Sequence, residues 1–212
     1  MAPGVRTTML KKILKYLALI LFAVVIVGVF LPAKSTASRQ IEIKAPATVI
    51  FGLLNGFQRF NEFSPWYQYD PGAEYSWSGP TTGVGATMAW KSAHERVGNG
   101  MQEIIAVEAN QSVTTRLQFD APGTSIARWQ LTPAPGSTRV TWQMESDAGW
   151  NLLGRWFGVF LDRMIGPDFE SGLKRLKSVA EAEASKPAVA AQDIALLKKV
   201  DSLVSYVFRP DR

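Results

Sequence analysis

The pattern of apolar and polar positions begins with one long apolar run. Residues 13–31, ILKYLALILFAVVIVGVFL, carry a single charge near their start. About twenty apolar residues are what a helix needs to cross a bilayer, and this run lacks the polar face of a surface helix in a soluble domain. The pattern therefore predicts a transmembrane helix over residues 13–31, after a short N-terminal segment at 1–12.

Beyond this run the pattern changes to the alternation typical of strands. RQIEIKAP predicts a first strand, and two short helices follow between Pro46 and Pro65. Six further alternating runs are separated by turn residues: AEYSWSG, ATMAWKSA, GMQEIIAVEA, SVTTRLQFD, TSIARWQLTP and TRVTWQMES. Their spacing leaves no room for crossover helices, so we predict an antiparallel meander.

The end of the chain has helical periodicity. LLGRWFGVFLDRMIGPDFESGLKRLKSVAEAEA predicts one long helix, bent at Gly166–Pro167. The predicted fold is α+β, with a curved seven-stranded antiparallel sheet wrapped around this helix. The predicted limits are a cytoplasmic N-terminus at 1–12, the membrane helix at 13–31, a linker at 32–38, the folded domain at 39–184, a linker at 185–191 and an amphipathic helix at 192–212.

Charge predicts the orientation of the membrane helix. Basic residues gather between residues 6 and 15 and are fewer after the apolar run, which places the N-terminus in the cytoplasm by the positive-inside rule. The domain is then expected on the periplasmic or extracellular side, as in a single-pass protein of a bacterial inner membrane. The alternative is a cleaved secretory signal that ends at Ala33 or Ala37.

Composition excludes several kinds of chemistry. The sequence has no cysteine and one histidine, His94, so disulfides and thiol nucleophiles are ruled out and no metal site or cofactor is expected. The net charge of +5 is dispersed along the chain, and no nucleic-acid partner is expected.

The glycine-rich stretch SGPTTGVGATMAW, Ser78 to Trp90, raises the question of a phosphate-binding loop. Such a loop follows a strand and opens a helix, whereas residues 87–90 continue as a strand. Gly83 and Gly85 are therefore interpreted as turn and bulge glycines.

Alternation assigns one apolar and one polar face to the sheet, with Ala106 on the apolar face. One helix about 10 Å wide cannot fill the concave side of a curved sheet, so a hydrophobic pocket is predicted. Its candidate ligand-binding residues are Trp66, Tyr75, Trp77, Met88, Trp90, Gln102, Ile104, Thr115, Leu117, Phe119, Trp129, Trp142, Met144, Phe160 and Met164. The tryptophans also suit a packed core, which is the more common role of large aromatic side chains.

No catalytic residue is assigned. His94 falls in the loop SAHERVGNG, Glu103 points outward by the alternation, and Asp168 is interpreted as an acid in the first turn of a helix. An acid/base pair inside the pocket, which a cyclase or hydrolase requires, is not evident.

The order of strand, two short helices, meander and long helix resembles the START-like, helix-grip superfamily. The segments IEIKAPATVIFGLLNGFQRFNEFSPW, SGPTTGVGATMAW, GNGMQEI, LTPAPGSTRVTWQM and IGPDFESGLKRLK look like the polyketide cyclase/dehydrase, or SRPBCC, group. The resemblance spans about Arg39 to Glu181. It implies a sheet that grips the C-terminal helix around a cavity for lipids, sterols, aromatic polyketides or hormones, and it does not imply one reaction.

Three hypotheses follow. The first is a membrane-tethered, non-catalytic module that binds a hydrophobic or amphipathic small molecule. The second is an aromatase/cyclase-like enzyme in which Gln102, Thr115, Tyr75 or Arg128 polarises a carbonyl. The third is an envelope sensor or interaction module, whose apolar segment WNLLGRWFGVFLDRMIG lies on the bilayer, gates the pocket or meets a partner. The C-terminal tail is a possible site for a protein partner.

Overall fold

A computed structural model describes residues 3–120, 124–186 and 199 of the chain. The helices are α1 (Pro3–Phe30), α2 (Ala47–Leu54), the 3-10 turn η1 (Phe60–Glu62), α3 (Pro65–Tyr69) and α4 (Leu152–Ser185). The strands are β1 (Lys34–Ile43), β2 (Glu74–Ser78), β3 (Thr87–Lys91), β4 (Gly100–Glu108), β5 (Ser112–Phe119), β6 (Thr124–Ala134) and β7 (Ser137–Asp147).

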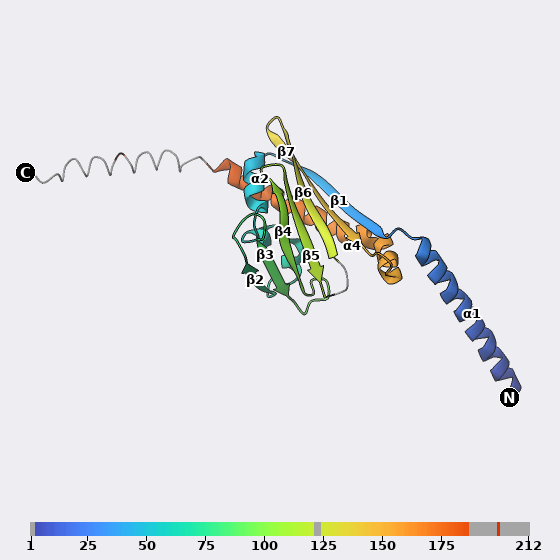
Figure 1. Cartoon of the computed structure of the whole chain (residues 1–212). Coiled ribbons are helices and arrows are strands. Elements are labelled where there is room, and N and C mark those ends of the chain that lie inside the picture. Colours follow the sequence, from blue (N-terminus) through green and yellow to red (C-terminus); the bar gives the residue numbers. More distant parts are fainter. Residues whose placement is uncertain (1–2, 121–123, 187–198, 200–212) are drawn as a thin grey trace, which may run out of the picture.

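The strands form one antiparallel sheet in the order β1-β7-β6-β5-β4-β3-β2. Each neighbour in the meander from β2 to β7 is also the next strand in sequence, and β1 closes the order beside β7. Figure 1 shows the sheet curving in front of α4, with α1 extending away from one end of the domain. The predicted α+β fold, with seven strands and one long C-terminal helix, is confirmed.

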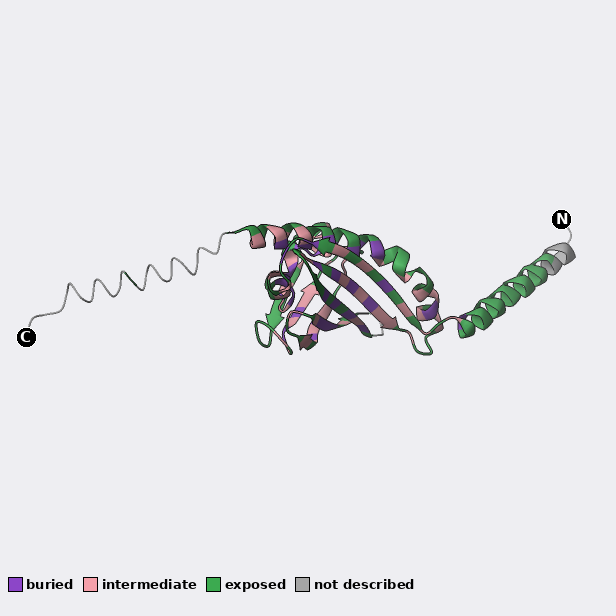
Figure 2. Cartoon of the chain, turned by 90° about the horizontal axis from the view of Figure 1, so that it is seen from above, coloured by how far each residue is buried: buried purple, intermediate pink, exposed green. Residues whose placement is uncertain are grey.

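The alternation of buried and exposed positions along the strands is visible in Figure 2. In β4 it is shifted by a β-bulge between Ile104 and Ala106, where β4 pairs with β5. A bulge adds a residue to one strand, so the side chains beyond it change face. Ala106 is therefore exposed and Val107 packs against the core, which corrects the prediction that Ala106 belongs to the apolar face.

The core lies between α4 and the β6–β7 half of the sheet. The ring of Trp142 stacks between those of Trp129 and Phe169, with 4.1 Å between ring centroids on each side. Trp66 contacts Trp142 edge-on from α3. Gly172 of α4 faces Trp142, so the helix approaches the sheet closely here.

The N-terminal helix is longer than predicted and the linker after it is shorter. α1 begins at Pro3 rather than residue 13, and β1 begins at Lys34, inside the stretch 32–38 that was expected to be a linker. The reason for the early start of β1 is its pairing: Lys34 lies opposite Asp147 and Ile43 opposite Thr138, so the whole strand is held by β7. α1 contains one stretch, Met9–Phe30, that is long and apolar enough to cross a membrane.

The glycine-rich loop is a connection between two strands. Gly83 and Gly85 both have positive φ, a conformation that glycine adopts at little cost, and β3 follows directly. α4 is one continuous helix through Gly166 and Pro167. The linker predicted at 185–191 begins at the last residue of α4, and the helix predicted at 192–212 lies outside the described residues apart from Lys199.

Candidate functional site

A cavity of about 280 Å³ lies on the β3–β5 side of the concave face. α4 packs chiefly over β1, so the far half of the sheet is covered instead by α3 and the β3–β4 loop. The walls come from several elements, and the lining residues are Phe60, Ser64, Trp66, Tyr75, Met88, Trp90, Arg96, Val97, Gln102, Leu117, Phe119, Met144 and Ile165. The exposed lining surface is almost entirely apolar.

Eight of the predicted ligand-binding residues line this cavity. They come from α3, from four neighbouring strands and from β7: Trp66, Tyr75, Met88, Trp90, Gln102, Leu117, Phe119 and Met144. The structure brings them together because each strand contributes the side chains of one face, as alternation requires. Whether they bind a ligand stays a prediction.

Seven predicted residues do not line the cavity. Trp129, Trp142, Ile104 and Thr115 are buried in the packed part of the interior. Trp77 lies at the sheet edge, where its Nε1 donates to the Phe57 carbonyl at 3.3 Å. Phe160 and Met164 point outward from α4 and are 49% and 54% exposed.

The physical reason for this difference is the position of α4. A helix placed over the middle of the sheet would leave space on both sides, whereas a helix over β1 fills the β6–β7 half and leaves the rest. Sequence reasoning missed five lining residues: Phe60, Ser64, Arg96, Val97 and Ile165. Arg96 and Val97 come from a loop, for which alternation gives no signal, whereas Ile165 could have been found from its helical spacing to Phe169.

Three aromatic side chains separate the inner cavity from an outer, more open hollow of about 600 Å³. Tyr75, Trp90 and Phe119 line both spaces. The Trp90 indole lies against Gly100 of β4, where an added Cβ would come within 2.5 Å of its ring. Because all three come from the same end of their strands, this end is where the cavity meets the outside.

The β3–β4 loop is held over the cavity by a polar cluster. The Tyr69 hydroxyl donates to Asp168 Oδ1 at 2.5 Å, and Arg96 Nη2 lies 3.3 Å from the same oxygen. The Arg96 guanidinium also stacks over the Tyr69 ring, 4.1 Å from its centroid, and His94 stacks on that ring. The loop is thereby joined to α3 and to α4.

This cluster corrects the interpretation of Asp168. Asp168 lies in the middle of α4 rather than in the first turn of a helix, and it is buried. Its carboxylate is stabilised by the two donors just named, since a buried charge requires partners. The hydrogen bond to this carboxylate raises the pKa of Tyr69.

The polar groups that face the cavity are few. Gln102 is buried, and its side-chain amide makes no hydrogen bond within the described part of the chain. Burial raises the pKa of Tyr75, so its hydroxyl stays protonated and can donate. No group of three or more His, Asp or Glu side chains suited to a metal ion is found among residues 3–120, 124–186 and 199.

A curved antiparallel sheet, a C-terminal helix and an apolar cavity between them define a helix-grip fold. Solved structures share it: a norcoclaurine synthase point mutant from Thalictrum flavum in complex with a transition-state analogue is 13% identical, with a TM-score of 0.55 over 72% of this chain and 97% of that chain. A protein from Chromobacterium violaceum is 13% identical, with a TM-score of 0.52 over 69% and 98%. Ginseng major latex-like protein 151 from Panax ginseng is 13% identical, with a TM-score of 0.51 over 70% and 99%.

The sequence itself identifies the family. Residues 34–181 match the family model described as polyketide cyclase/dehydrase and lipid transport, and the chain belongs to this family. No curated protein matches the chain significantly. The resemblance predicted from the sequence is thus confirmed, and the family and fold together indicate hydrophobic ligand binding.

Proposed function

We propose that the chain is a membrane-anchored protein that binds a compact hydrophobic or amphipathic molecule in the cavity and does not transform it. The observation that carries the proposal is the apolar cavity with its buried, unpartnered amide at Gln102. Ligand pockets typically combine an apolar lining with a few polar groups, at about 300–1,000 Å³. The volume here, about 280 Å³, is just below this range, which favours a single acyl chain or a small ring system over a two-chain lipid.

The lining supports binding without catalysis. Its ionisable groups are Arg96 and Tyr75, and Arg96 already pairs with Asp168. Carboxylate and imidazole groups, which usually carry general acid–base catalysis, are absent from the lining, all of which lies in the described part of the chain. The aromatase/cyclase alternative would have to depend on Gln102 and Tyr75.

Contacts of α1 support a retained anchor rather than a cleaved signal. Cleavage after Ala37 would divide β1, which pairs with β7 from Lys34 onward. Cleavage after Ala33 would remove the Val29 and Leu31 carbonyls, to which Arg155 Nη1 donates at 2.7 and 3.2 Å. Arg155 is only 8% exposed, and a buried guanidinium left without these acceptors would be costly.

The test is native mass spectrometry of the full-length protein released from membranes. We expect the wild-type protein to retain a small molecule of defined mass. Leu117→Trp fills the cavity and should lower the retained fraction at least tenfold, because the ligand and the indole compete for one space. Arg116→Trp is the matched control: its side chain is on the exposed face of the same strand, and retention should be unchanged.

Two results would contradict the proposal. The first is a wild-type protein with no retained molecule, and the second is a Leu117→Trp variant that retains as much as the wild type. Conversion of the retained molecule to a second mass during incubation would favour the enzyme alternative.

A further inference from the structure

The first half of α4 carries an exposed apolar stripe on the side away from the sheet. Its members recur every three or four residues and therefore share one face. Within α4 the stripe consists of Leu153, Phe157, Phe160 and Met164, which are 73%, 66%, 49% and 54% exposed. Trp150, which is 82% exposed, lies two residues before the helix begins at Leu152. Side chains of this size, gathered on one face, mark a surface that meets another apolar body.

The stripe is held outward by contacts on the opposite side of the same half-helix. Gly158 lies against Ser35 and Gly166 against the Arg39 guanidinium, so both positions admit no side chain without displacement. Arg39 Nη1 donates to Asp162 Oδ1 at 2.6 Å and Arg39 Nε donates to Glu170 Oε1 at 2.8 Å. The half-helix is thus fixed to β1, and it cannot turn its apolar side inward.

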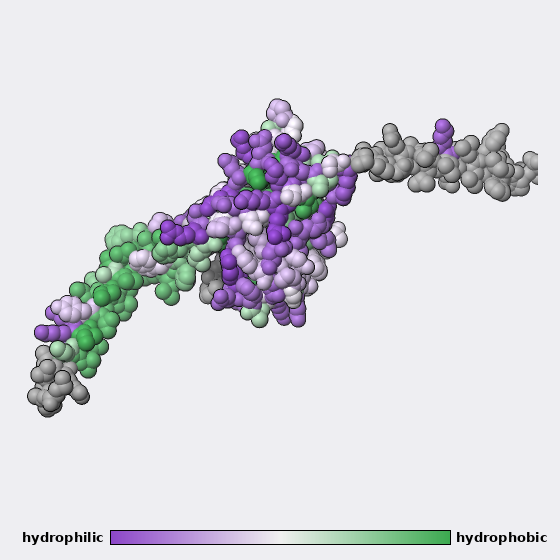
Figure 3. Space-filling model, turned by 180° about the vertical axis from the view of Figure 1, so that it is seen from behind, coloured by the Kyte–Doolittle hydropathy of each residue, from purple (hydrophilic) through white to green (hydrophobic). Residues whose placement is uncertain are grey.

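The stripe adjoins the last turns of α1. Trp156 Nε1 donates to the Val24 carbonyl at 3.3 Å, and its indole lies against Gly28. With the two Arg155 bonds described above, these contacts join the start of α4 to the end of α1. Figure 3 shows the apolar surface of α1 continuing onto the adjoining end of the domain, while the rest of that face is mostly hydrophilic.

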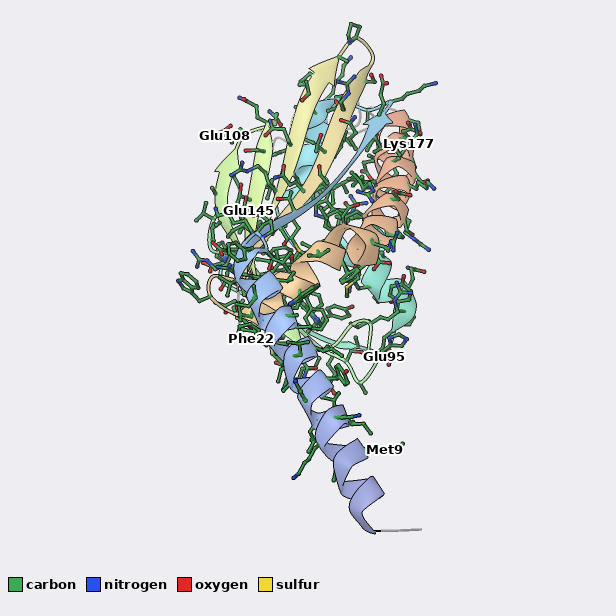
Figure 4. The ribbon with its side chains drawn as sticks, turned by 90° about the vertical axis from the view of Figure 1, so that its right-hand side faces the viewer. Met9, Phe22, Glu95, Glu108, Glu145 and Lys177 are labelled. Atoms are coloured by element: carbon green, nitrogen blue, oxygen red, sulfur yellow. The ribbon has the colours of Figure 1, made fainter. Side chains whose placement is uncertain are left out.

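Length places this junction at a membrane boundary. The apolar stretch Met9–Phe30 has 22 residues, which at 1.5 Å per residue span about the 30 Å of a bilayer core. Its final turns are therefore where α1 leaves the hydrocarbon. Figure 4 shows α1 extending away from the domain, with Met9 at the far end and Phe22 nearer the domain.

We infer that the stripe is a docking surface for the lipid bilayer beside the anchor, with Trp150 and Phe157 inserted at the level of the headgroups. This inference rests on the proposed membrane anchoring of α1. Amphipathic helices with tryptophan and phenylalanine on the apolar side bind in this way, and basic residues at their flanks attract anionic lipids. Arg163 is exposed at the flank of the stripe.

Docking in this orientation brings the cavity to the lipid. Ile165 of the same half-helix lines the cavity, one residue from Met164 of the stripe. The strand ends that carry the aromatic side chains Tyr75, Trp90 and Phe119 lie at the same end of the sheet as the start of α4 and of β1. A ligand of the cavity is therefore taken directly from the bilayer, without passing through water.

The sequence has no cysteine, so a single introduced cysteine reports one position. We would reconstitute full-length Phe157→Cys in vesicles of phosphatidylglycerol and phosphatidylethanolamine and label it with the environment-sensitive fluorophore NBD. Spin-labelled lipids should quench the fluorescence of the label at position 157. The control is Lys174→Cys, at an exposed position on the second half of α4. Aqueous dithionite should reduce the label at position 157 at least fivefold more slowly than the label at position 174.

An aqueous, dithionite-sensitive label at position 157 would overturn the inference. A label that is protected from dithionite but not quenched by spin-labelled lipid would overturn it in favour of a protein partner. A cross-link between position 157 of two chains would overturn it in favour of a second copy. Native mass spectrometry of the same preparation keeps the two proposals distinct. An unprotected label on a protein that retains its small molecule contradicts docking alone, whereas a lipid-quenched label on a protein without a retained molecule contradicts the proposed function alone.

Discussion

Tyr69 is the residue that joins α3 to the centre of α4. Its hydroxyl donates to the buried Asp168 carboxylate, and its ring lies under the Arg96 guanidinium. One side chain therefore contacts both groups that hold the β3–β4 loop over the cavity. A hydrogen bond to a charged group contributes about 1.5–3 kcal/mol.

The Tyr69 bond predicts a dependence on alkaline pH. The carboxylate raises the pKa of Tyr69, so this stabilisation is fully present below the unfolded pKa, about 10. It is lost as pH rises through the higher folded pKa. We expect Tyr69→Phe to lower the free energy of unfolding by about 1.5–3 kcal/mol at pH 8 and by less at pH 11, as measured by denaturant titration of the full-length protein in detergent.

The control for this prediction is Tyr67→Phe, the same change two residues away in α3. Its side chain makes no hydrogen bond within the described residues, so its effect should not change between the two pH values. A Tyr69→Phe effect that is equal at pH 8 and pH 11 would contradict the role assigned to the hydroxyl.

At the scale of the element, α4 depends on glycines that let it approach the sheet. Gly172 is enclosed on three sides: an added Cβ would lie 2.8 Å from the Trp142 ring, 3.1 Å from Pro65 and 3.4 Å from the Phe63 carbonyl. The Gly154–Gly158 pair, whose spacing also matches a membrane-helix dimer motif, faces Ala148 and Ser35 of the same chain. Packing within the domain thus accounts for this spacing.

Gly172→Ala is expected to destabilise the protein even though alanine favours helix. Overpacking a tight core typically costs about 1–3 kcal/mol, which exceeds the gain of about 1 kcal/mol in helix propensity. Thermal unfolding should show a lower midpoint. Ser171→Ala, at an exposed neighbouring position, should shift stability by less than about 0.5 kcal/mol, and an equal shift for both variants would count against close packing at Gly172.

Periodicity was enough to predict the strands, their antiparallel order and the long helix, because both faces of these elements have distinct polarity. It could not predict which part of the sheet α4 covers. That choice depends on Arg39, Gly158 and Gly166, which meet only across β1 and α4. For the same reason Trp129 and Trp142 were assigned to a pocket, although they are core. The bulge at Ile104 leaves no sign in the alternation of apolar and polar residues along the sequence. It moves the side chain of Ala106 from the apolar face of the sheet to the exposed face.

For the whole molecule, the orientation across the membrane can be tested directly. We predict that a cysteine at the exposed Thr132 reacts with an impermeant maleimide in intact spheroplasts, whereas a cysteine at Thr8 reacts only after the membrane is disrupted. The physical reason is the excess of basic residues before the apolar stretch. The opposite pattern would reverse the proposed topology, and equal labelling before disruption would contradict a span.

The connection between α1 and β1 has only Leu31, Pro32 and Ala33, which reach about 10 Å when extended. Two of the three also form backbone hydrogen bonds. The Leu31 N–H donates to the Val27 carbonyl, and the Ala33 carbonyl accepts from the Ala148 N–H. Under the proposed anchoring, so short a connection keeps the domain at the surface of one membrane. A molecule bound in the cavity would then be transferred only to a recipient that comes to the same membrane surface.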